Sequence, residues 1–113
     1  MKNKENYLDK IPMKNHTFSW ELEDGLVVIH MENKGIYNKI AQKFFGSPKV
    51  THVSLDELGS FVWEQIDGQR SIYQIGQLVN DEFGESAEPI YERLSKYFYN
   101  LNSTKFITFK VKG

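Results

Sequence analysis

Three histidines stand in or beside segments with strand-like patterns: His16, His30 and His52. Imidazole nitrogens are common zinc ligands, and the ligands of a zinc site usually recur at short, regular spacings. These three residues show no such spacing, and His16 precedes the first strand-like pattern. We therefore interpret them as core or edge residues, and we predict neither a metal site nor a cofactor.

The carboxylate pairs offer little more for catalysis. Asp56-Glu57 and Asp81-Glu82 fall at the ends or on the solvated faces of expected helices, where charge is ordinary. The sequence has no glycine-rich phosphate loop, no Gly-x-Ser-x-Gly elbow and no His-Glu-x-x-His pattern. It also has no cysteine, which excludes disulfides, iron–sulfur clusters and a thiol nucleophile. We predict that the chain is not an enzyme.

Length and the distribution of apolar residues restrict the remaining classes of protein. A chain of 113 residues favours one domain with a modest core. The N-terminus lacks the apolar core of a signal peptide, and no apolar run reaches the ~20 residues needed to cross a bilayer. We expect a cytoplasmic protein with a flexible arm at residues 1–15, partly tied down near Ile11-Pro12, and one domain at residues 16–113.

The first half of that domain reads as strands around one amphipathic segment. Residues 17–22 alternate, with Phe18, Trp20 and Leu22 facing one way. A turn at Glu23-Asp24-Gly25 joins them to a second, more apolar strand at residues 26–31, which makes a hairpin. Residues 36–44 show helical spacing and predict a short helix, either a lid or a docking face for a partner. Residues 50–53 predict a third strand.

Three short helices follow, each opened by a serine. Ser54 with Glu57 and Ser71 with Gln74 match the capping box, in which each side chain bonds the backbone of the other residue. Ser86 is expected to cap the third helix, and residues 106–111 to form a last strand. This order predicts an α+β, winged-helix-like fold: an N-terminal three-stranded antiparallel sheet, a three-helix bundle and a short C-terminal strand.

Paired short helices are common in DNA-binding proteins of the helix-turn-helix type. The formal net charge is -1, without the basic surplus that neutralises phosphates. The third helix would also open with three acidic residues, Glu85, Glu88 and Glu92. Both features argue against nucleic acid. What remains is binding through an exposed strand edge, to which an extended peptide can add itself as a further strand.

The run Asp67-Gly68-Gln69-Arg70-Ser71-Ile72-Tyr73-Gln74-Ile75 resembles the PqqD family. Members have a helix that ends in an Asp-Gly turn, followed by Arg-Ser/Thr-x-x-Glu/Gln-Ile at the start of the next helix. Leu101 is similar to a leucine near the end of the family's third helix. The resemblance covers residues 50–110 closely, and the N-terminal hairpin by the order of its elements.

This resemblance implies a RiPP recognition element, a peptide chaperone that binds the leader of a ribosomally made precursor and presents it to a modifying enzyme, frequently a radical SAM protein. The leader would add as a strand beside the third strand and lie against the third helix. The implied peptide-binding residues are Val50, Thr51, His52 and Val53 on the strand, and Tyr91, Arg93, Leu94, Lys96, Tyr97 and Phe98 on the helix. Arg93 and Lys96 would serve acidic leader residues, whereas Leu94 and Phe98 also fit a plain core.

Two departures from the family pattern concern the groove more than the fold. The segment at residues 34–49 is longer than the tight link expected between the second and third strands. The final hydrophobic segment also lacks the glycine that often precedes it in the family. Two alternatives remain open at this point: a winged-helix DNA-binding regulator, and an assembly subunit that docks through residues 36–44.

Overall fold

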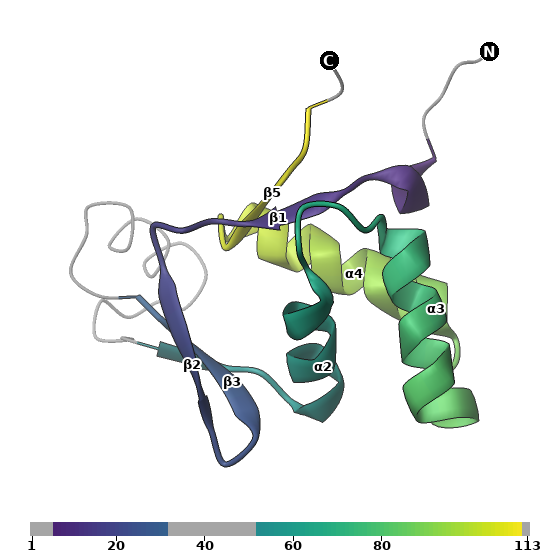
Figure 1. Ribbon diagram of the computed structural model, residues 1–113, viewed down its shortest axis with the longest axis horizontal. Coiled ribbons are helices and arrows are strands. Elements are labelled where there is room, and N and C mark those ends of the chain that lie inside the picture. The colour runs from purple at the N-terminus through teal and green to yellow at the C-terminus, as the bar shows by residue number, and fades with distance from the viewer. Residues whose placement is uncertain (1–5, 32–51, 112–113) are drawn as a thin grey trace. The chain divides into compact units, whose positions relative to one another are not determined.

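The computed structural model describes residues 6–31 and 52–111 (Figure 1). The chain divides into two compact units, residues 16–60 and residues 1–15 with 61–113, and each is described by itself. The expected helix at residues 36–44 lies outside the described residues. None of the helices in the described ranges combines the length and apolar character needed to cross a membrane.

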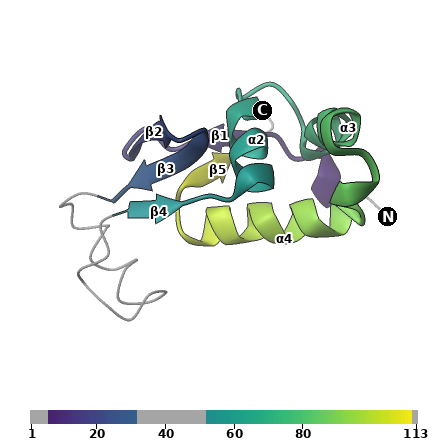
Figure 2. The ribbon, with the colours of Figure 1, turned by 90° about the horizontal axis from the view of Figure 1, so that it is seen from below.

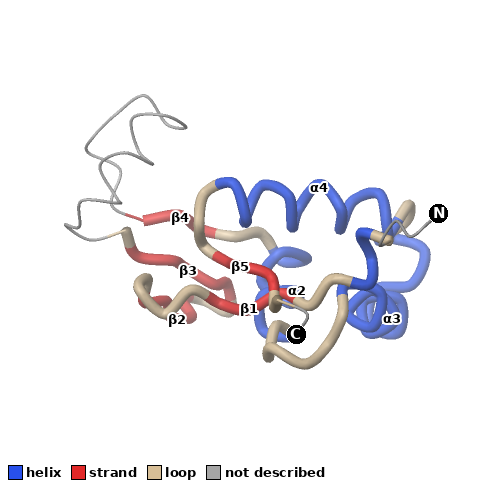
Figure 3. The backbone as a smooth tube through the Cα atoms, turned by 90° about the horizontal axis from the view of Figure 1, so that it is seen from above, coloured by secondary structure: helices blue, strands red, loops and turns tan. Residues whose placement is uncertain are grey.

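The unit of residues 16–60 contains a three-stranded antiparallel sheet in the order β2-β3-β4 (Figure 3). Its strands are β2 (Ser19–Glu23), β3 (Leu26–His30) and β4 (His52–Ser54). Asp24 and Gly25 join β2 to β3 with φ angles of 55° and 82°. Two successive positive φ angles are the mark of the type I′ turn, whose twist suits a hairpin. The predicted N-terminal sheet is therefore confirmed.

The two strands of the hairpin differ in burial. Three consecutive residues of β3, Val27, Val28 and Ile29, are buried, as the continuous apolarity of that strand predicted. On β2, Phe18 precedes the strand and is buried, but Leu22 is 51% exposed. The predicted apolar face of β2 is therefore covered at Phe18 and in part at Trp20, but less at Leu22. Leu22 lies near the tip of the hairpin, where it pairs with Val27 and about half of its surface stays open to solvent.

Helix α2 (Glu57–Gln65) begins later than the sequence suggested. Ser54 is the last residue of β4, so the predicted capping box of Ser54 and Glu57 is wrong. Asp56 caps the helix instead, because its Oδ1 accepts a bond of 2.7 Å from the Gly59 N–H. Buried Ser60 then ties the helix start to the sheet, since its Oγ accepts from the Val27 N–H at 2.8 Å.

The other unit is built on helices α3 (Ile72–Phe83) and α4 (Ile90–Ser103), which lie side by side in Figures 1 and 2. A 3-10 turn, η2 (Gly84–Ala87), joins them. The prediction that Ser86 caps α4 is wrong. Ser86 lies within η2 and donates its hydroxyl to the Phe83 carbonyl, whereas Pro89 stands at the N-cap of α4 with no side-chain cap.

The N-terminal segment contributes structure from Tyr7 onward. A 3-10 turn, η1 (Tyr7–Asp9), is followed by β1 (Pro12–Lys14), which pairs antiparallel with β5 (Ile107–Phe109). The expected tie near Ile11-Pro12 thus takes the form of strand pairing. The predicted final strand is present, and the α+β class is confirmed. Figure 2 shows α4 beginning beside α3 and ending where the chain turns into β5.

Candidate peptide-binding site

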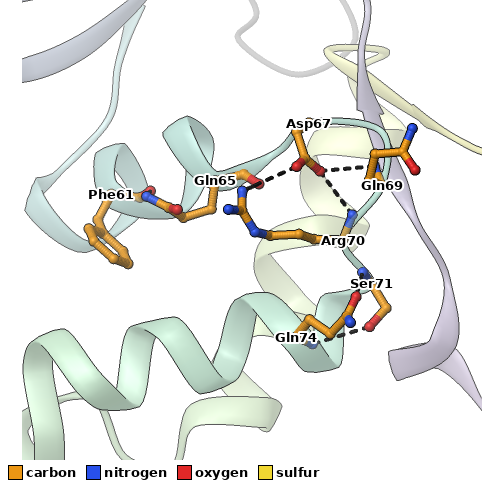
Figure 4. Close-up of polar contacts among 7 residues, drawn as sticks. All are labelled: Phe61, Gln65, Asp67, Gln69, Arg70, Ser71 and Gln74. Carbon is orange, nitrogen blue, oxygen red and sulfur yellow. Dashed lines mark hydrogen bonds and ion pairs between the residues drawn. The ribbon is translucent and has the colours of Figure 1, made fainter.

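The Asp67–Arg70 turn connects α2 to α3 through a network centred on one carboxylate (Figure 4). Asp67 Oδ1 accepts from the backbone N–H groups of Gln69 and Arg70, each at 2.9 Å. The Arg70 side chain points back along the turn, where its Nη1 lies 3.3 Å from Asp67 Oδ2 and donates to the Gln65 carbonyl at 3.1 Å. Arg70 thus satisfies a carbonyl at the open end of α2.

These bonds lower the pKa of Asp67. The backbone N–H of Arg70 contributes most and that of Gln69 next, while partial burial opposes them and the Arg70 charge adds a smaller lowering. Each of these donors stabilises the ionised carboxylate. The motif that carries the family resemblance is therefore an ionised Asx turn that sets the direction of the chain between two helices.

The predicted capping box at the start of α3 is confirmed. Ser71 Oγ accepts from the Gln74 N–H at 3.1 Å, and Gln74 Oε1 accepts from the Ser71 N–H at 2.9 Å. The next N–H, on Ile72, donates to the Lys10 carbonyl at 3.0 Å. All three bonds satisfy donors that a helix start otherwise leaves open, so they fix where α3 begins.

The predicted peptide-binding residues of α4 occupy different faces of the helix. Leu94 and Phe98 are 2% and 0% exposed, and with Ile90 and Leu101 they form the buried stripe of α4. The sequence left open whether Leu94 and Phe98 contact a ligand or the core. In the structure both residues lie in the core. They hold α4 in position and cannot themselves line an open surface.

Tyr97 lies on one flank of that stripe, half-buried, with its ring edge-on to Phe98 at a centroid distance of 5.2 Å. Arg93 and Lys96 are exposed. At 100° per residue, Arg93 lies next to Tyr97 on the helix circumference and Lys96 follows beyond it. The Arg93 Nη1 donates to the Ser86 carbonyl at 3.3 Å. This flank therefore combines an aromatic ring with two cationic side chains.

Tyr91 lies on the opposite flank, toward α3. Its ring stacks on Tyr73 of α3, with the centroids 5.5 Å apart and the planes inclined by 15°. Gly76 makes room for it, because a Cβ on Gly76 would lie only 3.0 Å from Cζ and 3.1 Å from Cδ1 of the Tyr91 ring. Tyr91 therefore belongs to an α3–α4 surface that is separate from the flank of Tyr97.

The predicted strand residues lie in β4 only in part. His52 and Val53 belong to β4, whereas Val50 and Thr51 lie outside the described residues. Val53 pairs with Ile29, and the Leu55 N–H donates to the Val27 carbonyl at 2.8 Å. Backbone groups alternate in direction along an antiparallel strand, so those of His52 and Ser54 point away from β3. The strand order of the described residues ends at β4.

One group in the described part of the chain brings possible metal ligands together. Donor atoms of Glu21, Glu23 and His30 lie within 4.8 Å of one another. His30 Nε2 is 2.9 Å from Glu21 Oε2, so these two side chains are already hydrogen-bonded to each other. Both glutamates are exposed on the edge strand β2. The cluster is explained as a cross-strand contact between β2 and β3.

Comparison with known protein families identifies the family of this chain. The family described as Coenzyme PQQ synthesis protein D (PqqD) matches residues 25–107. The chain belongs to the PqqD family. Proteins of this family are non-catalytic RiPP recognition elements that bind a precursor peptide and act with a modifying enzyme in PQQ synthesis. No curated protein and no solved structure matches the chain significantly.

In this PqqD-family chain, the sequence pointed to the right family but missed one aromatic contact and one backbone direction. The pairing of Tyr73 with Tyr91 was not predicted, although a glycine inside a helix pattern, Gly76, was the available signal for close approach. The outward direction of the Ser54 backbone was not predicted either, because the helix start was placed two residues too early.

Proposed function

We propose that the chain is a non-catalytic chaperone that binds the leader of a ribosomally made precursor peptide by strand addition to β4 and presents it to a separate modifying enzyme of the radical SAM class. The observation that carries this proposal is the position of β4 at the end of the strand order in a chain of the PqqD family. An added strand binds through main-chain hydrogen bonds, which supply affinity for extended peptides of many sequences.

Strand β4 (His52–Ser54) forms the strand side of the proposed site. Its main-chain contacts alternate, so the leader would bond to the backbone of His52 and Ser54, whereas Val53 stays bonded to β3.

The flank of Tyr97 supplies selectivity in this proposal. Its ring offers an apolar contact, and Arg93 and Lys96 select leaders with acidic residues by charge-assisted hydrogen bonds. Leu94 and Phe98 act indirectly, because their burial fixes the orientation of α4. Tyr91, stacked on Tyr73, is left out of the leader contacts.

An NMR titration tests the proposal directly. The probe is the leader of a short peptide encoded beside the gene for this chain, ideally next to a radical SAM enzyme, added to the ¹⁵N-labelled protein. We expect amide shifts or broadening at residues 52–54 and 93–97. The control is a DNA duplex of mixed sequence. If a saturating leader leaves these signals unchanged while the duplex moves them, a DNA-binding regulator replaces the chaperone.

A further inference from the structure

The face shared by α3 and α4 carries a pocket that is separate from the residues proposed above to bind the leader. Its volume is about 740 Å³, and it lies within one compact unit of the chain. The residues that matter to its chemistry are Arg70, Tyr73, Gln77, Asp81, Glu88 and Tyr91. It is therefore a polar, aromatic hollow on the side of α4 opposite Tyr97.

The stacked rings of Tyr73 and Tyr91 form the aromatic part of this pocket. Tyr91 is seated against the backbone of α3 at Gly76, so its ring is fixed in place. Tyr73 stacks on it and remains 46% exposed. A large aromatic residue held by its neighbour and still open to solvent is the kind of anchor that protein interfaces use.

The pocket carries a net negative charge, because its arginine is already paired and its two carboxylates are not, among the described residues. The guanidinium of Arg70 is already bound to the Asp67 carboxylate and the Gln65 carbonyl. Asp81 and Glu88 make no ion pair with any described residue, although Glu88 Oε1 accepts a bond of 3.4 Å from the Ile90 N–H. Burial raises the pKa of Tyr91, and the neighbouring Tyr73 and Glu88 add to the rise. Two carboxylates that form no ion pair with a described residue therefore line the same pocket as the tyrosine pair.

We propose that this pocket binds an arginine or lysine side chain from a basic segment of the peptide-modifying enzyme. A cation is attracted to the face of a tyrosine ring, and the carboxylates that line the same pocket can accept hydrogen bonds from its N–H groups. Gln77 adds a neutral donor and acceptor at the same site.

The enzyme, rather than the leader, is the occupant because the two surfaces differ in charge. The flank of Tyr97, with Arg93 and Lys96, suits an acidic leader, and such a leader would be repelled by Asp81 and Glu88. A basic ligand of the pocket must then come from the other partner. Naming that partner as the enzyme rests on the proposed function, whereas the preference of the pocket for a cation does not.

The cation preference is tested with small probes. The ¹⁵N-labelled chain is titrated with the capped peptide acetyl-Gly-Arg-Gly-amide and, as a matched control, with the neutral peptide in which citrulline replaces arginine. We expect the arginine peptide to shift the amides of Tyr73, Gln77 and Asp81, and added salt to weaken it. Equal shifts with the citrulline peptide would overturn the proposal.

The double variant Asp81→Asn with Glu88→Gln removes both charges and keeps the shape and the oxygen acceptors. We expect it to weaken the arginine peptide by about tenfold, since each exposed charge contact contributes a modest part of such affinity. Unchanged affinity for the arginine peptide would also overturn the proposal. A circular dichroism spectrum checks that the variant is folded.

The same variant separates the two partners. With the purified enzyme encoded beside the gene, affinity should fall about tenfold, while affinity for the leader stays the same. Unchanged enzyme affinity, or a loss confined to the leader, would reject the enzyme as occupant. Failure of the proposed function would show elsewhere, as a leader that leaves residues 52–54 unshifted whatever happens at the pocket.

Discussion

The ring of Tyr91 occupies the space beside α3 that a side chain at Gly76 would need. A Cβ on Gly76 would lie 3.0 Å from Cζ and 3.1 Å from Cδ1 of that ring, and closer still to Cε1. Such separations are shorter than ordinary van der Waals contact. Because Tyr91 is also stacked on Tyr73, moving its ring disturbs both helices.

Gly76→Ala is therefore expected to destabilise the protein by about 1 kcal/mol. Alanine gains roughly 1 kcal/mol of helix propensity over glycine, but overpacking costs about 1–3 kcal/mol and the aromatic pair is worth about 0.5–1.5 kcal/mol. Urea unfolding of the two proteins measures the difference.

The matched control removes the ring. In a Tyr91→Ala background the added methyl group has open space, so Gly76→Ala should stabilise by about 0.5–1 kcal/mol through helix propensity alone. The sign of the effect thus reverses between the two backgrounds. A stabilising Gly76→Ala change in the presence of Tyr91 would show that the ring does not hold this position.

The start of α2 gives a second prediction, because the sequence predicted Ser54 as its cap and the structure shows Asp56. Asp56→Ala should cost about 1 kcal/mol, since Asp56 Oδ1 accepts from the Gly59 N–H. Ser54→Ala should change the free energy of unfolding by less than about 0.5 kcal/mol, because Ser54 is an exposed strand residue. Ser71→Ala, in the confirmed capping box, serves as the positive control. If Ser54→Ala costs as much as Ser71→Ala, the cap of α2 is misassigned.

This pair shows where sequence is sufficient and where it is not. The patterns Ser-x-x-Glu at residue 54 and Ser-x-x-Gln at residue 71 are equivalent in local chemistry. At Ser71 the preceding residues form a turn, so the serine is free to cap. At Ser54 the preceding strand continues through the serine, because its neighbour Val53 pairs with Ile29 of β3. Because of this long-range pairing, Asp56 rather than Ser54 caps the helix, which begins at Glu57.

The sequence predicted part of the candidate site, as it predicted part of the helix capping. Apolar spacing along α4 indicated its buried stripe, but a stripe residue such as Leu94 looks alike from sequence whether it meets the core or a ligand. The placement of Tyr91 depends on how closely α3 and α4 approach. Gly76 inside a helix pattern signals a close approach, but the sequence does not specify which residue makes it. The family motif at Asp67–Arg70 was readable because its function is local: the carboxylate bonds the two N–H groups that follow it.

That carboxylate gives a prediction on pH. Its pKa in the folded protein is lower than the ordinary 3.8, so ionised Asp67 stabilises the fold. The contribution is complete above the unfolded pKa and is lost as the pH falls through the folded pKa. The stability difference between the natural protein and Asp67→Asn, which cannot titrate, should therefore be constant from pH 7 to about 5 and shrink below about pH 4. Urea unfolding at each pH measures it. A difference that stays level down to pH 3 would mean that Asp67 keeps its ordinary pKa.

The edge of β4 gives the prediction that bears most directly on peptide binding. Ser54→Pro removes one N–H group that points away from β3, and it leaves the ladder bonds of Val53 in place. Proline is tolerated at such positions of edge strands. We expect Ser54→Pro to weaken the leader by about tenfold, the worth of one main-chain hydrogen bond with its local fit. Isothermal titration with the leader measures the affinity.

Ser54→Ala is the matched control for that experiment, because it deletes the hydroxyl and keeps the N–H. It should bind the leader like the natural protein, and both variants should show the same amide pattern along β3.

Tyr97→Ala should weaken the affinity for the leader as well, whereas Tyr91→Ala should not, since the two rings lie on opposite flanks of α4. If Ser54→Pro is folded and binds the leader at full strength, the peptide does not add as a strand beside Ser54. If Tyr91→Ala instead produces the larger loss, the leader uses the α3 side of α4.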